Sequence, residues 1–519
     1  MSGPRPSSGP SVLIRADASP RIGGGHIMRC LSLAGELALR GASVSFACAS
    51  IPDGLAERVE EAGHSLFRIA PVRELLVEAE NWDTALVSPE AQRQDSAEAM
   101  AGAGPVDWII LDHYRLDAAW LDASGPARKL AVDDLANRPL SCDMLVDQTF
   151  GRRSSDYSAL VPADCEVLAG ARYAMLRPEF AAARPEALAR RRRGGGVERL
   201  LISLGSTDIG GITINALESV LAAEVRCAID VVLGTGARSL EPVRALAADN
   251  PRIRLHVDTA DLVSLMLVAD LAIGAPGTSS WERCCLGLPA ITLILADNQR
   301  LVSKMLAEAG AVAAVDSAEQ IGGAVARLID DQAARARMIA AAAAITEGRG
   351  VQLVADAMLG AGAEARASPI ALRPVESGDS SALWLWRNDP EMRAMAKTPD
   401  PIPWTDHERW FAGIVAGGDS RLFMADMAGE PAAMVRFDRR EGGALVSINV
   451  DPALRGRGVG KSALIAACER YEAEACLEAL VAEIRPANAA SVRIFEAAGF
   501  ERAASRAKEF LRFERRRRD

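Results

Sequence analysis

Short apolar runs alternate with longer amphipathic segments over the first 355 residues of the chain. The run at 12–14 leads through a polar loop into a segment whose apolar residues recur at helical spacing, from Met28 to Leu37. Short apolar runs between turn residues are typical of buried strands, and their alternation with helical segments is typical of parallel sheets. We therefore expect two successive α/β units. Their strands are predicted at 12–14, 43–49, 106–111, 130–132 and 144–146, and then at 199–204, 228–233, 253–257, 271–273 and 288–295.

Acidic residues stand directly after several of the expected strands in the first unit. Asp112, Asp133 and Asp147 each follow an apolar run. The carboxyl ends of parallel strands meet at one edge of a sheet, where open α/β folds bind their ligands. The pattern therefore predicts a polar ligand crevice at this edge.

The composition changes twice along the chain. Residues 181–196 are rich in Ala, Arg and Gly, and we interpret them as a connection between domains. Residues 345–370 are rich in Ala, Gly and Ser, and are interpreted as a second linker before a region of a different character. The predicted domains are 11–185, 197–355 and 371–513. Strands in the last domain are expected at 421–426, 432–437 and 444–450.

Composition and charge narrow the classes of function. The 519-residue chain has a net charge of −10, which argues against a general nucleic-acid binder. The basic runs 190–193 and 515–518 are interpreted as solvated charge. Nine cysteines without a C-x-x-C pair indicate reduced thiols and no metal site. Without an apolar leader or a run of about 18 apolar residues, we expect a cytoplasmic protein with no membrane partner. Oligomeric state is left open.

A glycine-rich loop links the first expected strand to its helix. Gly23, Gly24 and Gly25 are contiguous and His26 follows them, so the dinucleotide fingerprint G-x-G-x-x-G is not met. Such a loop lets a ligand approach the backbone and directs a helix N-terminus at an anion. A single histidine in this place is more often structural than catalytic, so the loop alone leaves both interpretations open.

Three turns in the second unit carry small and polar residues where strands meet helices. Backbone N–H groups in such turns can hold a diphosphate, and a carboxylate such as Glu282 can accept both hydroxyls of a ribose. Each turn by itself could equally be an ordinary strand-to-helix connection. The candidate residues are Gly205, Ser206, Thr207, Asp208, Ser279, Ser280, Glu282, Asn298 and Gln299.

Taken together, the loop 15–30 and these turns resemble the UDP-2,4-diacetamido-2,4,6-trideoxy-β-L-altropyranose hydrolases. These are inverting enzymes of pseudaminic acid biosynthesis with the two-domain fold of GT-B glycosyltransferases. The resemblance covers about residues 11–355 and implies a GT-B-like pair of Rossmann-like domains.

The resemblance also implies roles for individual residues. His26 matches the general base of the family, and an imidazole with a pKa near ~6.5 suits that task at neutral pH. Tyr114 and Asn298 match site positions, and the turns of the second unit would hold UDP. Asp17, Tyr114 and Gln299 are expected sugar contacts. Asp17 could equally cap a helix.

A second glycine-rich stretch follows the strand that ends at Val450. It reads Arg455, Gly456, Arg457, Gly458, Val459, Gly460 and Lys461. Consecutive N–H groups in such a turn can bind a pyrophosphate without a metal. A Walker A loop is rejected, because the position five residues before Gly460 is arginine.

This R-x-x-G-x-G pattern, with Asn488, Ser491 and Phe495 further on, resembles the GNAT acetyltransferases over about residues 370–513. The resemblance implies acetyl-CoA as co-substrate and the Val450 N–H as donor to the thioester oxygen. No tyrosine lies after Ser491, where the superfamily often has its general acid, so the acid is left open between Ser491 through water and no acid at all. Glu483 and His407 are candidate bases.

Two aromatic segments refine the expected acceptor. Trp384, Trp386 and Trp410 lie in segments resembling acetyltransferases that act on 4-amino groups of UDP-sugars, although each could be a core residue. The two resemblances imply one bifunctional enzyme. It would N-acetylate the 4-amine of UDP-4-amino-4,6-dideoxy-N-acetyl-β-L-altrosamine. It would then release UDP with inversion to give 2,4-diacetamido-2,4,6-trideoxy-L-altrose.

The alternatives are another UDP-diamino sugar, a GT-B glycosyltransferase fused to an acetyltransferase, or a first region that only presents substrate.

Overall fold

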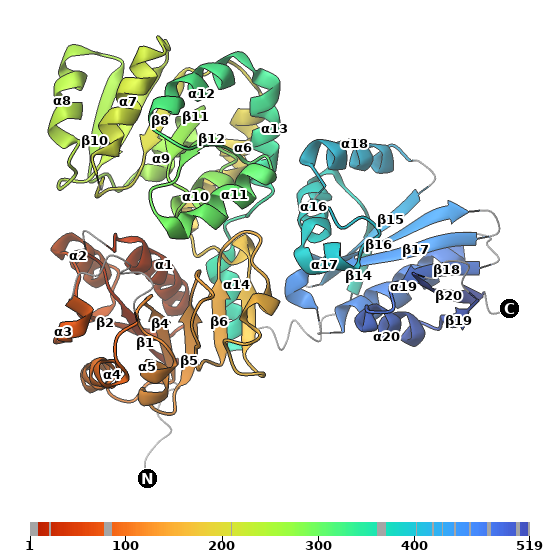
Figure 1. The fold of residues 1–519 in the computed structure, drawn as a ribbon. Coiled ribbons are helices and arrows are strands. Elements are labelled where there is room, and N and C mark those ends of the chain that lie inside the picture. Colours follow the sequence, from red (N-terminus) through yellow and green to blue (C-terminus); the bar gives the residue numbers. More distant parts are fainter. Residues whose placement is uncertain are drawn as a thin grey trace. The chain divides into compact units, whose positions relative to one another are not determined.

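The computed structural model describes residues 9–19, 22–76, 86–208, 210–360, 370–400, 402–417, 420–427, 429–440, 443–455, 458–474, 479–504 and 509–516. The chain forms two compact units, Met1–Met358 and Leu359–Asp519 (Figure 1). The first unit contains two parallel sheets and the second contains a mixed sheet.

The first sheet has seven parallel strands in the order β3-β2-β1-β4-β5-β6-β7. The order reverses between β1 and β4, and ligands bind at such a switch point in open α/β sheets. The predicted strands are β1 (Ser11–Ala16), β2 (Ser43–Cys48), β4 (Trp108–Asp112), β5 (Arg128–Val132) and β6 (Met144–Asp147), and β3 (Ser65–Arg68) and β7 (Glu166–Ala169) form the edges. The helices are α1 (Gly25–Leu39), α2 (Asp53–Glu61), α3 (Arg73–Leu76), α4 (Pro89–Ala103) and α5 (Ala118–Ala123).

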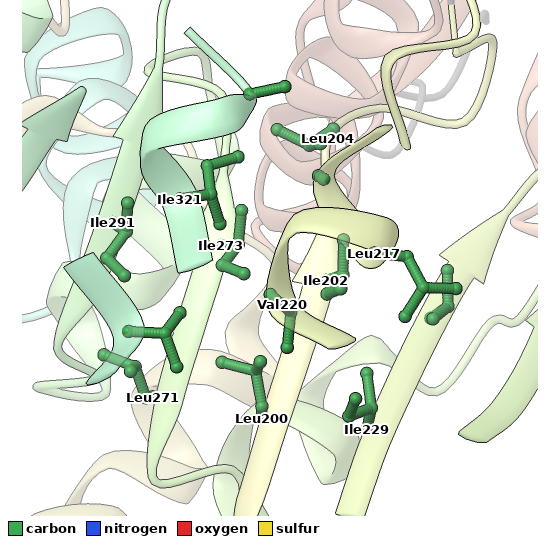
Figure 2. Close-up of a cluster of buried hydrophobic side chains, with 14 of the residues drawn as sticks. Leu200, Ile202, Leu204, Leu217, Val220, Ile229, Leu271, Ile273, Ile291 and Ile321 are labelled. Carbon is green, nitrogen blue, oxygen red and sulfur yellow. The ribbon is translucent and has the colours of Figure 1, made fainter. Parts of the chain in front are cut away.

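The second sheet has six parallel strands in the order β10-β9-β8-β11-β12-β13. Its strands are β8 (Arg199–Ser203), β9 (Ala228–Leu233), β10 (Ile253–Val257), β11 (Leu271–Gly274), β12 (Ala290–Leu293) and β13 (Val312–Val315). Its helices are α7 (Ile212–Ala222), α8 (Leu240–Asp249), α9 (Leu262–Val268), α10 (Ser279–Cys285), α11 (Arg300–Glu308), α12 (Glu319–Asp330) and α13 (Gln332–Ala343). Figure 2 shows Leu200 and Ile202 of β8 among the labelled side chains of the apolar core of this sheet, together with Leu217 and Val220 of α7.

Two helices occupy segments that composition had marked as linkers. The segment 181–192 lies within α6 (Pro178–Arg192), which packs on α9, α10 and α13. Arg191 is buried and donates to the carbonyl of Met266 at 2.7 Å, so its expected solvated charge is wrong. Alanine and arginine are strong helix formers, which explains why this composition gives a packed helix.

The second helix, α14 (Gly350–Leu359), lies in the expected linker 345–370 and returns to the first sheet. Arg40, the residue after α1, donates to Asp356 at 2.6 Å, and a Cβ on Gly350 would lie 2.1 Å from the carbonyl oxygen of Ala174. Only glycine permits this close approach. Residues 361–369 of the expected linker lie outside the described residues.

The second unit has a seven-stranded sheet in the order β14-β15-β16-β17-β18-β20-β19. The strands are β14 (Ile370–Pro374), β15 (Ser420–Met427), β16 (Glu430–Arg440), β17 (Gly443–Val450), β18 (Ala479–Ile484), β19 (Glu501–Ala503) and β20 (Leu511–Arg516). The helices are α16 (Ser380–Asn388), α17 (Pro390–Met395), α18 (Trp404–Val415), α19 (Val459–Glu474) and α20 (Ala489–Ala497).

The pairing of β17 with β18 is parallel and short. It runs from Gly443 opposite Ala479 to Leu445 opposite Val481, and no later residues of the two strands pair with each other. The two strands therefore separate toward Val450 and leave backbone N–H and C=O groups on their facing edges without a strand partner.

Candidate active sites

His26 is the second residue of α1, directly at the carboxyl edge of the first sheet. It is 7% exposed, and its Nδ1 lies 2.5 Å from Oδ1 of Asp112, the last residue of β4. A carboxylate only accepts, so Nδ1 carries the hydrogen, and in the neutral ring Nε2 has the lone pair. Gly23, at φ 77°, makes the turn that brings the helix start here.

Arg29 keeps Asp112 ionised. Its Nε donates to Oδ2 at 2.7 Å and its Nη2 donates to Oδ1 at 2.6 Å. Burial opposes ionisation of Asp112, but Arg29 and then His26 outweigh it and hold the pKa of this carboxyl well below its usual range. The Cys30 thiol donates to Oδ2 at 3.3 Å. All partners of the carboxylate therefore come from α1.

Tyr114 covers one side of His26. The two rings meet edge to face with centroids 4.6 Å apart. The Tyr114 hydroxyl donates to Asp134 Oδ2 at 3.1 Å, and Arg29 Nη1 reaches the same oxygen at 3.1 Å. Tyr114 and Asp112 thus restrict both the ring orientation and the tautomer of His26.

Asp17 lies in a separate buried network. Its Oδ1 accepts from the N–H groups of Ala49 at 2.8 Å and Ser50 at 3.0 Å, and Arg15 pairs with it at 2.7 Å. Asp17 joins the ends of β1 and β2. No side chain caps α1, whose N-cap is Gly24, so the helix-cap alternative for Asp17 is wrong.

The acids at the ends of β5 and β6 share one hydroxyl. Tyr157 OH lies 2.8 Å from Oδ2 of Asp133 and 2.8 Å from Oδ2 of Asp147. A hydroxyl has one hydrogen, so one of these contacts requires a protonated carboxyl. Burial raises the pKa of Asp147 to about 7 despite the Arg152 guanidinium at 2.6 Å, which makes Asp147 the proton carrier.

In the second sheet, the carboxylate of Asp208 stabilises the turn that follows β8. Asp208 is buried with φ 44°, and its two oxygens accept from the N–H of Thr213 at 2.9 Å and of Ser239 at 2.8 Å. Its carboxylate is therefore a support of the turn and is not free for a substrate. Gly205 and Ser206 of the same turn are exposed.

The turn at the start of α10 likewise contains side chains that stabilise the turn, and in addition one carboxylate that does not. Arg283 donates to the hydroxyls of Ser279 at 3.1 Å and Ser280 at 2.9 Å. The Glu282 carboxylate has no hydrogen bond or ion pair with any residue that the structure describes. Burial raises the pKa of Glu282, more than the positive charge of Arg177 lowers it. Glu282 thus retains the hydrogen-bonding capacity that a polar ligand requires.

The two halves of the first unit meet near these groups. A Cβ on Gly25 would lie 3.6 Å from the hydroxyl of Thr278, the residue before α10. The His26 loop and the turn before Glu282 therefore face each other. Gln299 accepts from the N–H of Leu295 at 3.0 Å, and the side chain of Asn298 lies outside the described part of the chain.

In the second unit, the glycine-rich stretch leads into the start of α19. It lies next to the end of β17, where β17 and β18 separate. Gly458 has φ 82°, and a Cβ on Gly460 would lie 3.1 Å from Cγ2 of Val450. Lys461 is exposed, whereas Arg455 pairs with Asp389 at 2.6 Å. Gly456 and Arg457 lie outside the described residues, and the Val459 side chain is in the core.

The side chains of the last motif, from Asn488 to Phe495, have mostly structural contacts. Asn488 caps α20 by accepting from the Ser491 N–H at 3.0 Å. Phe495 is 3% exposed and packs against Phe500, so its side chain belongs to the core and does not face a cofactor.

Neither candidate base of the second unit is a free base. His407 is buried, its Nε2 lies 2.8 Å from the carbonyl of Ser380, and burial lowers its pKa to about 4. A neutral ring that donates Nε2–H to a carbonyl cannot take a proton there. Glu483 pairs with Lys397 at 2.5 Å. The core alternative is correct for Trp384, whose Nε1 donates to the Ile402 carbonyl at 2.8 Å, and for Trp386, which is 5% exposed.

Sequence reasoning missed the partners Asp112 and Arg29 as site residues. The signal for Asp112 was its place after a buried strand, and Arg29 follows His26 by one helical turn. Among the described residues, no group of three or more His, Cys, Asp or Glu side chains could hold a metal ion. Over the same ranges, no helix has the length and apolar character needed to cross a membrane.

Comparisons with known proteins separate the two units. Residues 370–501 match the family model described as "Acetyltransferase (GNAT) domain". The UDP-2,4-diacetamido-2,4,6-trideoxy-beta-L-altropyranose hydrolase of Campylobacter jejuni subsp. jejuni serotype O:2 is 26% identical over 302 residues, covering 58% of this chain and 97% of that protein. The spore coat polysaccharide biosynthesis protein SpsG of Bacillus subtilis is 24% identical over 266 residues, which are 50% of this chain and 76% of that protein.

Among solved structures, MurG of Acinetobacter baumannii aligns with 67% of this chain and 98% of its own, at 17% identity and a TM-score of 0.46. The predicted fold class, a GT-B-like pair of Rossmann-like halves followed by a GNAT unit, is confirmed by the two parallel sheets and the family match. The second unit is therefore an acetyltransferase domain with acetyl-CoA as co-substrate. The first unit resembles a sugar-nucleotide hydrolase.

Proposed function

We propose that the chain is a bifunctional nucleotide-sugar enzyme with the two reactions expected from its sequence. Its second unit acetylates the 4-amine of UDP-4-amino-4,6-dideoxy-N-acetyl-β-L-altrosamine. Its first unit then hydrolyses the product to UDP and 2,4-diacetamido-2,4,6-trideoxy-L-altrose. The observation that carries the hydrolase assignment is the His26–Asp112 pair, because it holds an imidazole with a free Nε2 at the ligand edge of the sheet.

Hydrolysis needs an activated water more than it needs an acid. UDP is a weakly basic leaving group, so its oxygen departs without protonation. Nε2 of His26 takes a proton from water while the water oxygen bonds to the anomeric carbon and the bond to UDP breaks on the opposite face. Attack opposite the leaving group inverts the configuration. Asp112 stabilises the imidazolium that forms, at 2.5 Å from Nδ1.

The second half of the unit holds the nucleotide in this proposal. Glu282 retains an unpaired carboxylate, and a ribose supplies two hydroxyl donors to it. Gly205 and Ser206 are exposed residues, and we assign their backbone N–H groups to a phosphate. Asp208, Ser279 and Ser280 keep these turns in shape.

Acetyl transfer proceeds by direct attack of the neutral amine on the thioester carbon. The carbon–nitrogen bond forms, the negative charge passes through the carbonyl oxygen, and the carbon–sulfur bond breaks to give the thiolate of coenzyme A. The separated end of β17 presents the Val450 N–H to that oxygen. The thiolate departs unassisted or takes a proton through water from Ser491.

Release of UDP from the 4-amino sugar nucleotide tests both halves. We expect release to require acetyl-CoA, and to fall by at least about a hundredfold in His26→Ala while acetyl transfer continues. His256→Ala is the matched control, because His256 pairs with Asp230 on β9 at 2.8 Å, away from the His26 site. An unchanged rate in His26→Ala contradicts the proposal and favours a first unit that only presents substrate. A glycoside in place of free sugar indicates a glycosyltransferase.

A further inference from the structure

Three arginines of the acetyltransferase unit lie on neighbouring elements, and only one of them pairs with a carboxylate of a described residue. They are Arg387 on α16, Arg393 on α17 and Arg436 on β16, and all are partly buried. One nitrogen of each guanidinium is fully buried and has no hydrogen-bond partner: Nη1 of Arg387, Nε of Arg393 and Nε of Arg436. Buried guanidinium nitrogens without partners are costly, so three of them in neighbouring elements favour a compensating ligand.

The charge balance of this arginine cluster is positive. Arg387 donates to the carbonyl of Thr398 at 3.0 Å, and neither it nor Arg393 forms an ion pair with a described residue. Arg436 alone has a carboxylate, that of Asp438 at 3.0 Å. Burial lowers the pKa of Arg387, and the charges of Arg393 and Arg436 lower it further. The elements that carry the three arginines are packed together, since α16 contacts α17 and its Leu383 and Trp386 pack against Met434 of β16.

The nearest acids on the same helices are already used. Asp389 and Glu391 lie between Arg387 and Arg393 in sequence, and both pair with Arg455, at 2.6 and 3.1 Å. Both acids therefore share their charge with Arg455 of the glycine-rich stretch. The cluster thus keeps an unbalanced charge that an anion can neutralise.

A fourth unpartnered group lies on the same face of the sheet. Both amide atoms of Asn449 are buried without a partner. Asn449 stands opposite Met434 and Ser447 stands opposite Arg436, so Asn449 and Arg436 project to one face. Met434 packs there with α16 and α18, whereas α19 and its glycine-rich start cover the other face.

We propose that the arginine cluster binds the diphosphate of the acceptor, a nucleoside-diphosphate amino sugar. This deepens the proposed function and rests on it for the identity of the acceptor. Guanidinium forks bind phosphate oxygens in pairs, and the charge that three arginines keep after pairing with Asp438 matches the two negative charges of a sugar-nucleotide diphosphate. The phosphates of coenzyme A belong at the start of α19, on the other face. A polyamine or an aminoglycoside carries positive charge, which this cluster repels.

Chemical labelling tests the subsite without relying on catalysis. Phenylglyoxal modifies accessible arginines, and peptide mass spectrometry of the full chain reads each position separately. We expect UDP to protect the three arginines of the cluster at least about fivefold, while Arg409, an exposed residue of α18 with a side-chain exposure of 79%, stays equally reactive. Protection by coenzyme A but not by UDP, or no protection by saturating UDP, overturns the proposal.

Kinetics then tests the acceptor. In Arg387→Gln and Arg393→Gln we expect KM for the UDP-4-amino sugar to rise about tenfold or more, with KM for acetyl-CoA unchanged. Arg409→Gln is the matched control and keeps both constants. An equal rise in both KM values, or none, contradicts a diphosphate subsite. If the wild type acetylates no UDP-4-amino sugar but UDP still protects the cluster, the proposed sugar is wrong and the subsite stands.

Discussion

The His26 site of the first unit and the arginine cluster of the second treat buried charge in opposite ways. At the His26 site, each oxygen of Asp112 has donors from α1 within 2.7 Å. In the arginine cluster, Arg387 and Arg393 have no carboxylate partner among the described residues, and one nitrogen of each is unsatisfied. One site is complete before any ligand arrives, and the other is completed by its ligand.

This difference follows from the two tasks. A general base acts through its tautomer and orientation, so its partners must be in place before the reaction. A binding subsite gains affinity from groups that find partners only in the complex. Paired charges therefore indicate positioning for chemistry, whereas unpaired buried charges indicate where a ligand of opposite charge belongs.

Removing the charge of Asp112 should have the largest effect. In Asp112→Asn, we expect UDP release to fall by about 10³–10⁴-fold, because an amide no longer stabilises the imidazolium or fixes its tautomer. The first unit should also lose up to about 3–5 kcal/mol of stability, since the buried Arg29 charge then keeps only Asp134 as an ionic partner. Steady-state UDP release and urea unfolding measure the two effects.

Acetyl transfer by the same protein is the internal control for Asp112→Asn, and Asp53→Asn, whose side chain is 91% exposed, is the matched substitution. Full UDP release in a folded Asp112→Asn protein would show that His26 does not act as the base.

Asp147 is an intermediate case. Its carboxyl pairs with Arg152, but its contact with the Tyr157 hydroxyl also requires a bound proton. A carboxyl whose pKa rises on folding stabilises the protein below its ordinary pKa, and this stabilisation is lost as the pH rises through about 7. The stability advantage of the wild type over Asp147→Asn should therefore fall by about 1 kcal/mol per pH unit between pH 5 and 7. Hydrogen exchange of β5 and β6 peptides in urea measures it. A difference that is constant or grows with pH contradicts a shared proton.

His407 should have the smallest effect on chemistry. Its ring is neutral because burial lowers its pKa to about 4, so the pH profile of acetyl transfer should have the same shape in wild type and His407→Gln. We expect kcat to change less than about threefold, with a lower Tm from the altered contact to Ser380. Glu483→Gln is compared in the same assay. Loss of an acidic limb in His407→Gln alone would identify His407 as a base.

The sequence predicted those parts of the fold that rest on continuous apolar runs. The central strands of both parallel sheets have such runs, and they lie where expected. Three edge strands of these two sheets were missed: β3, β7 and β13 are four residues long and only partly buried, so their sequences lack the apolar signal. In the two segments that were predicted as linkers, helices were missed instead, because an Ala-rich composition is compatible with a helix as well as with a loop.

For the sites, local motifs placed His26, Glu282 and the glycine-rich start of α19, because loop chemistry is local. Long-range pairing was not accessible in the same way. His26 and Asp112 are 86 positions apart, and nothing in the sequence states which acid meets which base. Phe495 and Trp384 likewise lie in cores that are formed by tertiary contacts. Their motifs predicted ligand contacts, whereas both side chains are buried in the structure.

The attachment of α14 has a mechanical consequence. This helix follows the second sheet in the chain but is fastened to the first, through Arg40 and Asp356 and through the contact of Gly350 with Ala174. The last helix of the first unit therefore belongs to the half that carries His26, although it follows the second sheet in the chain. If the two halves open and close on a nucleotide, α14 moves with the His26 half, and the short segment between α13 and α14 takes up the displacement.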